Sequence, residues 1–394
     1  MRKSTIFGPI LALLLLSPLF LTGQNLPGGS AFSVTRSGSE GIQINFQLPA
    51  WEVEAVERDG TSYSRIRVDG IPNLFIGEEE TLPIFSAMVA IPVRGGVSLR
   101  VSNEVSESRS GLQPDFATSL NAERQAGRLG GILYPEHAVL ISEPQVLRDF
   151  RVVSLNVHPF QWNSATGELL VRESLTLNLD FDDGPSINET VPPLSLSPAF
   201  EKIYRGLILN YDQAAGRNAN YHNPRLLVIY GNYGDATYQG KVDEYVAWKR
   251  QKGYQVDAFS TATAGTTYTA IKTFIQGRYD NLNTRPDYIT IIGDDSGTIA
   301  VPTYSTYMDY YYTWLAGGDN LGDVAIGRIS VDSAAEMVDY MAKINILERD
   351  INPNMGAWLD RMLLVGDSST SGISTIYTNE YIHDRSLEIN PDYT

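Results

Sequence analysis

The sequence predicts an all-β sandwich or jelly-roll-like region, followed by an α/β domain with a mostly parallel sheet flanked by helices. Three observations support this division. From about Phe32 to Phe181, apolar residues alternate with polar ones, the period of strands that are buried on one face. After Pro224, short apolar runs alternate instead with helical patterns. Polar stretches at residues 184–198 and 212–224 lie between the two patterns.

Residues 1–23 have the features of a secretory signal peptide. Arg2 and Lys3 precede the apolar run Ile10–Leu21, and small or polar residues follow at positions 22–24. The run is short for a bilayer span, and no basic flank follows it. We therefore expect an exported protein, secreted or held at the cell surface, with no integral membrane segment after signal cleavage.

Several runs of the β region place their apolar residues on one face, which predicts a core between two sheets. The predicted inward-facing residues are Ile42, Ile44, Phe46 and Leu48, then Val153, Leu155 and Val157, then Leu175, Leu177, Leu179 and Phe181. Turn signals at Gly95-Gly96 and at residues 163–167 separate such runs. A short helix is expected at about residues 199–209.

The α/β region repeats strand and helix with short connections, which implies a mostly parallel sheet covered on both faces. Strands are predicted at residues 226–230, 255–259, 287–293 and 323–329, and a fifth begins at 362–365. A helix from about 240 to 252 meets Gly253, and Ser333 with Glu336 forms a capping box for a later helix. That later helix is expected to bury Met337, Met341, Ile344 and Leu347. Since the last strand–helix unit ends near Thr394, we expect the fold to continue beyond it.

Composition excludes several classes of function. The 394 residues carry a net charge of −16 with a pI of about 4.7, which disfavours binding to nucleic acid. The sequence has no cysteine, so it can form neither a disulfide nor a thiolate metal site, and it holds no thiol nucleophile.

Acidic side chains cluster in the loops after residue 287. Asp294, Asp319 and Asp323 are candidate ligands for a structural Ca²⁺ ion, because calcium prefers several hard oxygen ligands on flexible loops. The spacing matches no EF-hand, and the alternative is that these residues cap strands and turns. No other cofactor is expected.

Other catalytic patterns receive little support. Gly366-Asp367-Ser368 follows an apolar run and has the general form of a nucleophile turn, with His383 nearby, but no partnering motif accompanies it. A strand-ending turn is the better interpretation. The sequence contains no HExxH, Walker A or GxGxxG motif, which argues against metallohydrolase, P-loop nucleotide and dinucleotide sites.

A series of short sequence segments, here called blocks, occurs in a distinctive order along the chain. The upstream blocks are Ile71-Pro72, Leu82-Pro83, residues 90–92, Tyr134-Pro135, Arg148 with Arg151-Val152, and Pro159 followed by residues 163–167. The downstream blocks are residues 224–229, 246–249, Lys252-Gly253, 288–294, Asp309 with residues 310–312, and 323–329. In order and spacing they resemble the gingipain-like cysteine peptidases, secreted bacterial enzymes distantly related to caspases.

The resemblance implies a domain plan. Residues 1–23 would be the signal peptide, 24–215 a β-rich propeptide, 216–223 a linker, and 224–394 the N-terminal part of a truncated, caspase-like peptidase domain. Family members use a His in a Gly-His-Gly motif and a strand-end Cys as catalytic dyad. This sequence contains neither motif, so no catalytic residue is assigned within it.

Two residue roles follow from the resemblance. Glu380 lies closest to the acidic residue that arginine-specific members place in the substrate pocket, although a helix-surface glutamate is the alternative. Arg217, in the linker, is the expected site of propeptide cleavage.

The leading interpretation is a secreted cysteine endopeptidase precursor that acts on proteins or peptides and is inhibited intramolecularly by its own prodomain. The alternatives are a catalytically inactive surface or secretion-machinery protein of the same fold, and a Ca²⁺-dependent adhesion module.

Overall fold

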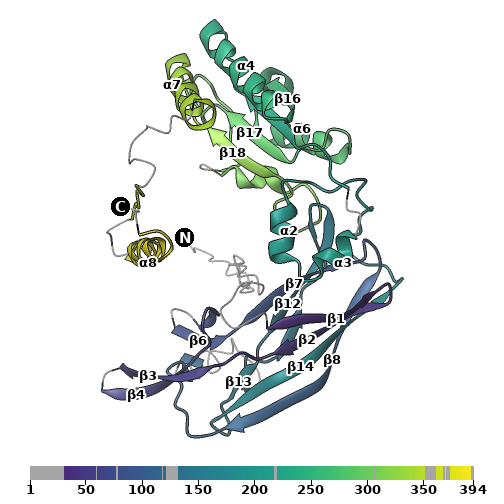
Figure 1. Cartoon of the computed structure of the whole chain (residues 1–394), viewed down its shortest axis with the longest axis vertical. Coiled ribbons are helices and arrows are strands. Elements are labelled where there is room, and N and C mark those ends of the chain that lie inside the picture. Colours follow the sequence, from purple (N-terminus) through teal and green to yellow (C-terminus); the bar gives the residue numbers. More distant parts are fainter. Residues whose placement is uncertain are drawn as a thin grey trace, which may run out of the picture.

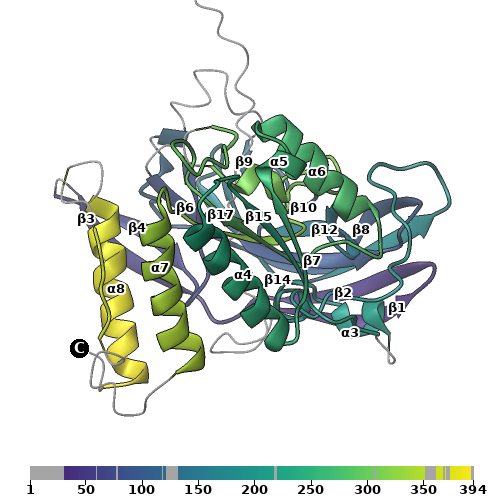
Figure 2. The same ribbon diagram turned by 90° about the horizontal axis from the view of Figure 1, so that it is seen from above.

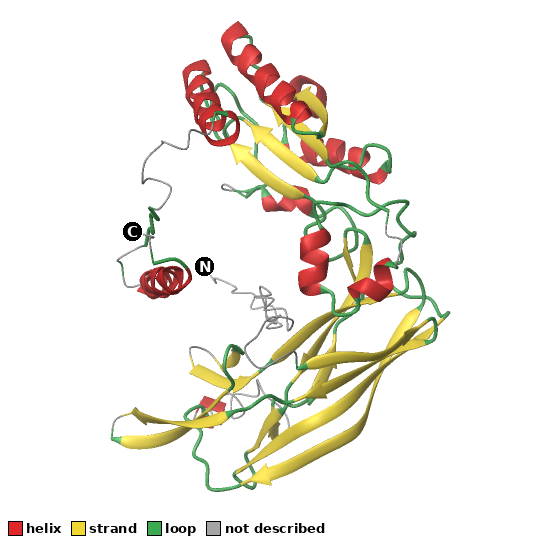
Figure 3. Cartoon of the chain, in the orientation of Figure 1, coloured by secondary structure: helices red, strands yellow, loops and turns green. Residues whose placement is uncertain are grey.

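A computed structural model describes residues 31–58, 60–76, 79–117, 119–120, 132–216, 220–305, 308–350, 361–366, 369 and 373–391. The predicted signal peptide, Arg217 and Asp367 lie outside these residues. A β-rich half occupies the lower part of Figures 1 and 3, and an α/β half lies above it. Within the described ranges, no helix has the length and apolar character needed to cross a membrane.

Two antiparallel sheets face each other in the β-rich half. The larger has the order β1 (Phe32–Gly38), β2 (Gly41–Gln47), β14 (Glu168–Asp182), β13 (Phe160–Asn163) and β9 (Leu133–Tyr134), with β8 (Gly96–Arg109) also paired to β14. The second has the order β10 (Val139–Ile141), β12 (Phe150–Val157) and β11 (Gln145–Leu147), with β7 (Phe85–Ile91) also paired to β12. The β-rich half also contains two separate hairpins: β3 (Glu52–Arg58) with β4 (Thr61–Arg67), and β5 (Asn73–Ile76) with β6 (Glu79–Pro83).

The core between these sheets is the one that alternation predicts. The predicted inward-facing residues of β2, β12 and β14, with Leu48 just after β2, are buried in one cluster, except Phe181, which is half-buried at its margin. The outer face of the second sheet is also covered. There α2 (Glu201–Leu207) and α3 (Tyr211–Ala215) pack Tyr204 and Tyr211 onto Phe150 and Val152. These two helices lie between the sandwich and the α/β half (Figure 1).

The α/β half is built on a four-stranded parallel sheet with the order β16 (Gln255–Ser260), β15 (Arg225–Tyr230), β17 (Tyr288–Ile292) and β18 (Ala325–Ile329). One face is covered by α4 (Ala236–Gln251) and α7 (Ala334–Ile344). The other is covered by α5 (Thr261–Ala264) and α6 (Tyr268–Asp280). Figure 2 shows these helix pairs on opposite sides of β15 and β17. The predicted α/β class is therefore confirmed.

Two local predictions are wrong. Leu347 does not share the buried face of α7, because the chain passes into a π-helical segment, η2 (Asn345–Arg349), and Leu347 is 52% exposed. A π-turn takes more residues per turn than an α-helix, which rotates the following side chains away from the expected face. The fifth strand also fails to form: residues 361–366 have no strand structure, and Leu363 and Val365 are 87% and 78% exposed. Residue periodicity predicts an extended run but not the neighbour that must pair with it.

Candidate functional site

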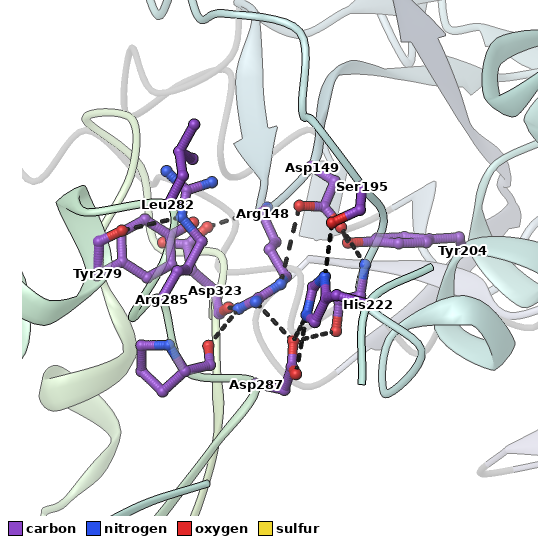
Figure 4. Close-up of polar contacts among 12 residues, drawn as sticks. Arg148, Asp149, Ser195, Tyr204, His222, Tyr279, Leu282, Arg285, Asp287 and Asp323 are labelled. Atoms are coloured by element: carbon purple, nitrogen blue, oxygen red, sulfur yellow. Dashed lines mark hydrogen bonds and ion pairs between the residues drawn. The ribbon is translucent and has the colours of Figure 1, made fainter. Parts of the chain in front are cut away.

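The candidate site is a polar network at the junction of the two halves, and it begins at a tight turn of the sandwich. Strands β11 and β12 pair with Leu147 opposite Phe150, so Arg148 and Asp149 form a two-residue turn between them. Arg148 has a φ of 50°, a left-handed conformation uncommon for a residue with a side chain. The turn points Arg148 out of the sandwich and into the α/β half (Figure 4).

The guanidinium group of Arg148 is buried among acceptors of the α/β half. Nη1 donates to the carbonyl oxygens of Pro286 and Asp323, each at 2.7 Å. Nη2 donates to Oδ1 of Asp287 at 2.6 Å, and both side chains of this ion pair are 0% exposed. The rings of Phe200 and Tyr279 lie 5.2 and 5.9 Å from the guanidinium carbon, within the range of cation–π attraction.

Asp287 collects further donors from the segment that joins the halves. It accepts from the Ser197 hydroxyl at 2.6 Å and from the backbone N–H of Arg225 at 2.7 Å. Nε2 of His222 lies 3.0 Å from both carboxylate oxygens. Burial alone would raise the pKa of Asp287, but the His222 hydrogen bond and the charge of Arg148 hold that pKa below its ordinary value. Asp287 is therefore an ionised carboxylate.

His222 links this carboxylate to the end of the sandwich region. Its Nδ1 lies 3.0 Å from the hydroxyl of Ser195. Because ionised Asp287 can only accept, Nε2 carries a proton, and a neutral ring then accepts the Ser195 hydroxyl proton at Nδ1. The backbone reinforces the contact, since Leu196 N–H donates to the Asn220 carbonyl at 2.7 Å.

The order Ser195–His222–Asp287 is that of a hydrolytic triad, but the electrostatics do not suit nucleophile activation. In a triad the carboxylate stabilises the imidazolium that forms when the base takes a proton. Here the charge of Asp287 is already paired with Arg148 at 2.6 Å. The network instead has the character of a structural junction.

Two acidic residues singled out from the sequence lie beside this junction. Oδ1 of Asp323 accepts from the backbone N–H of Arg148 at 3.0 Å, and Oδ2 accepts from Leu315 and Ala316 N–H at 2.8 and 2.7 Å. Burial outweighs these hydrogen bonds and raises the pKa of Asp323 to about 7. Asp319 accepts from Val146 N–H at 2.8 Å, and burial raises its pKa as well.

The third predicted calcium ligand is elsewhere. Asp294 follows the carboxyl end of β17 and accepts from the Ser330 hydroxyl at 3.0 Å, whereas Asp319 and Asp323 precede the amino end of β18. The described residues contain no group of three or more His, Cys, Asp or Glu side chains that could hold a metal ion. Structural calcium stays a prediction of the sequence alone.

The remaining sequence candidates lie away from the junction. Glu380 is exposed on α8 (Ile373–Ile389), as is His383, whose Nδ1 contacts Asp384 at 3.1 Å. The proposed cleavage residue Arg217 and the turn residues Asp367 and Ser368 lie outside the described residues.

Sequence reasoning missed the junction itself. Arg148, Asp287 and His222 are far apart in the chain, and the block that contains Arg148 does not indicate its partners. The one signal was a charged Arg148-Asp149 pair within an apolar run, which a two-residue hairpin turn can accommodate.

Comparison with protein families matches both halves. The model of the C25 propeptide matches residues 130–217, and the model of peptidase family C25 matches residues 219–394. The turn with Arg148 thus falls in the propeptide match, and Asp287, Asp319 and Asp323 fall in the peptidase match.

Curated relatives are gingipains of Porphyromonas gingivalis. Gingipain R2 is 25% identical over 253 residues, covering 62% of this chain and 34% of the relative. Gingipain R1 is 26% identical over 255 residues, covering 62% and 25%. The chain therefore spans about a third or less of the length of these relatives.

Solved structures of gingipains are also similar. A complex of the pro- and mature domains of Porphyromonas gingivalis RgpB is 17% identical, with a TM-score of 0.38, and the match covers 47% of this chain and 99% of that one. The arginine-specific cysteine proteinase gingipain R (RgpB) is 23% identical, with a TM-score of 0.35, covering 44% and 40%. The two family models, rather than these low scores, show the relationship: the chain belongs to the gingipain-like cysteine peptidases of family C25, with the family's propeptide followed by the N-terminal part of its peptidase domain.

Proposed function

We propose that the chain is part of an exported cysteine endopeptidase precursor, in which the propeptide stays docked on the peptidase half and keeps it latent. Proteins or peptides would be the substrates. The 394 residues contain no cysteine and no Gly-His-Gly motif, so the proposed thiol nucleophile and its histidine base would be supplied from outside them.

One observation carries the proposal. The propeptide inserts Arg148 into the peptidase half, where its side chain is 0% exposed and ion-paired with Asp287. A charge buried this completely is stable only while all of its partners are in place. The two halves are therefore held in one arrangement, as intramolecular inhibition requires.

The test uses the complete product of the gene. We expect it to hydrolyse peptide substrates only after the propeptide has been removed, and to lose that activity on treatment with iodoacetamide. Activity that survives alkylation would exclude a thiol mechanism. A product that stays inactive after propeptide removal would favour the alternative of a catalytically silent member of the fold.

Cleavage after Arg217 would separate the propeptide, because this residue lies in a polar segment and is the last residue of the propeptide match, two residues before the peptidase match begins. We expect Arg217→Gln to block the cleavage while Arg205→Gln does not. Sequencing the N-terminus of the mature protein checks the site, and a mature protein that begins elsewhere contradicts it.

Glu380 remains the proposed acidic residue of the substrate pocket. Its exposed carboxylate on α8 could pair with a basic side chain of the substrate. In the complete product, Glu380→Gln should lower kcat/KM for substrates with a basic P1 residue by about tenfold relative to apolar ones. Glu388→Gln, on the same helix, is the control, and equal effects of the two variants would remove Glu380 from the pocket.

A further inference from the structure

The contacts of Arg148 define a socket that belongs to the peptidase half. Its three acceptors are the Pro286 and Asp323 carbonyls and the Asp287 carboxylate, on the loops that lead into β17 and β18. All three lie at the amino ends of parallel strands, whereas Asp294 marks the opposite, carboxyl ends.

The backbone of the socket is held by hydrogen bonds within the peptidase half. Asp287 N–H donates to the Arg225 carbonyl at 2.9 Å, and Ala325 N–H donates to the Asp287 carbonyl at 3.0 Å, so its backbone is fixed between β15, β17 and β18. The Asp287 carboxylate is oriented by Arg225 N–H and by His222, which are on the peptidase side of Arg217. Departure of the propeptide would therefore remove the donors Arg148 and Ser197 and leave the backbone of the acceptors in place.

The acceptor geometry selects a guanidinium over other cations. One nitrogen spans two carbonyl oxygens at 2.7 Å and a second meets the carboxylate at 2.6 Å, a planar fork that an ammonium cannot reproduce. The Tyr279 ring adds a face 5.9 Å from the guanidinium carbon. The charge is also complementary, since the ionised Asp287 carboxylate favours a cation.

The strained backbone of Arg148 supports the same assignment. A non-glycine residue at a φ of 50° persists only where the surrounding structure holds it. Here the Asp323 carboxylate holds the backbone N–H of Arg148 at 3.0 Å. This hydrogen bond helps to hold the turn that presents the side chain to the socket.

We propose that this socket is a binding site of the peptidase half for an arginine side chain, filled by Arg148 in the precursor and open to an arginine of another peptide once the propeptide has left. The idea rests on the proposed function only in supposing that the propeptide leaves. In this view Arg148 is an internal ligand, and peptides that carry arginine compete with the propeptide for the socket.

Chemical rescue of the whole 394-residue chain tests the site. Arg148→Ala empties the socket, and ethylguanidinium at constant ionic strength is the probe. We expect ethylguanidinium to raise the Tm of Arg148→Ala by a few degrees in a saturable manner, because a ligand that binds only the folded chain stabilises it. The wild-type chain, whose socket is filled, should show no such rise.

Two comparisons establish specificity. Ethylammonium should rescue at least about tenfold more weakly than ethylguanidinium, since it lacks the planar fork. The double variant Arg148→Ala/Asp287→Asn should lose the rescue, whereas Arg148→Ala/Asp180→Asn, altered at an exposed carboxylate, should keep it. Equal shifts in all variants, or no shift in Arg148→Ala, would overturn the proposal.

The proposal can still be tested if Arg148→Ala does not fold. Arg148→Gly accepts a φ of 50° without strain and serves as a second empty-socket variant. For either variant, recovery of the folded circular dichroism signal with ethylguanidinium is the expected result, and absence of recovery for both contradicts it. No step depends on peptidase activity, so this outcome is separate from that of the alkylation assay.

Discussion

Asp287 is the residue through which the two halves are most directly connected. It accepts hydrogen bonds from Arg148 and Ser197 on the propeptide side and from His222 and Arg225 on the peptidase side. A carboxylate that is 0% exposed depends on such donors, because water cannot replace them. Loss of its charge would leave buried Arg148 with the more distant Asp149 carboxylate, 3.9 Å from Nε, as its counter-ion.

Asp287→Asn should therefore lower the free energy of unfolding by roughly 3–5 kcal/mol, the range for breaking one partner out of a buried ion pair. Chemical denaturation of the 394-residue chain measures the change. Asp180→Asn, in an exposed pair with Arg100 at 3.1 Å, is the matched control and should cost less than about 1 kcal/mol. Similar losses for the two variants would show that the junction contributes nothing beyond surface charge.

Asp323 gives the stability a pH dependence with a definite sign. Its pKa is raised from 3.8 to about 7 by burial, so between those values the folded chain binds more protons than the unfolded chain. The contribution of Asp323 to the free energy of unfolding is then fully present below about pH 4 and is lost as the pH rises toward 7. Asp287 affects stability in the opposite direction and in a different pH range. Because its pKa is lowered, its contribution to the free energy of unfolding is lost only as the pH falls into the acid range.

Asp323→Asn isolates this effect. The difference in unfolding free energy between wild type and Asp323→Asn should fall by up to about 4 kcal/mol from pH 4 to pH 7. Urea denaturation at each pH provides the values, with Asp180→Asn again as control. A difference that is flat over this range would show that Asp323 ionises normally.

At the scale of elements, the sequence predicts what local periodicity determines and misses what distant partners determine. The burial of Ile44, Leu155 and Leu177 follows from alternation, because the sandwich covers one face of each strand. The fate of residues 361–366 depends on pairing with another strand, which their own pattern does not encode. The junction is missed for the same reason, since Arg148 and Asp287 are 139 residues apart.

Ser333 caps α7 as predicted, but the second hydrogen bond of the predicted capping box is shifted by one residue. Ser333 accepts from Glu336 N–H at 3.2 Å, and the Glu336 carboxylate accepts from Asp332 N–H at 2.6 Å rather than from the cap residue itself. Ser333→Ala should lower the free energy of unfolding by about 1 kcal/mol, because a first-turn N–H loses its acceptor. Ser333→Thr should retain most of the stability that Ser333→Ala loses, because threonine also carries a hydroxyl. Thermal denaturation of both variants measures the difference, and equal losses would mean that the cap does not stabilise the helix.

At the scale of the whole molecule, a few contacts couple two halves that have separate cores. The sandwich core and the two cores of the α/β half contain no common residue, so each half buries most of its own apolar surface, although Leu321 packs against the cluster under α2 and α3. The turn at Arg148 and the acceptors Asp287, Asp319 and Asp323 provide polar contacts between them. Perturbing this turn should loosen the junction before it affects either core.

Hydrogen exchange tests this separation. In Arg148→Ala, the amides of Val146, Leu315 and Ala316 should exchange about tenfold faster or more, because they donate to Asp319 and Asp323 at the junction. The amides of β2 and β14 should keep their rates. Arg100→Ala is the control for loss of an exposed arginine, and a uniform increase throughout the Arg148→Ala chain would mean that the halves unfold together.

The distance along the chain between Arg148 and its acceptors has a consequence for biosynthesis. Asp323 follows Arg148 by 175 residues, so a ribosome makes the entire sandwich and most of the following sheet before the last acceptor exists. Until then Arg148, at the tip of its hairpin, remains hydrated, because the α/β half that binds it is still incomplete. The order of translation thus delays domain docking to a late event, after both partners have begun to fold.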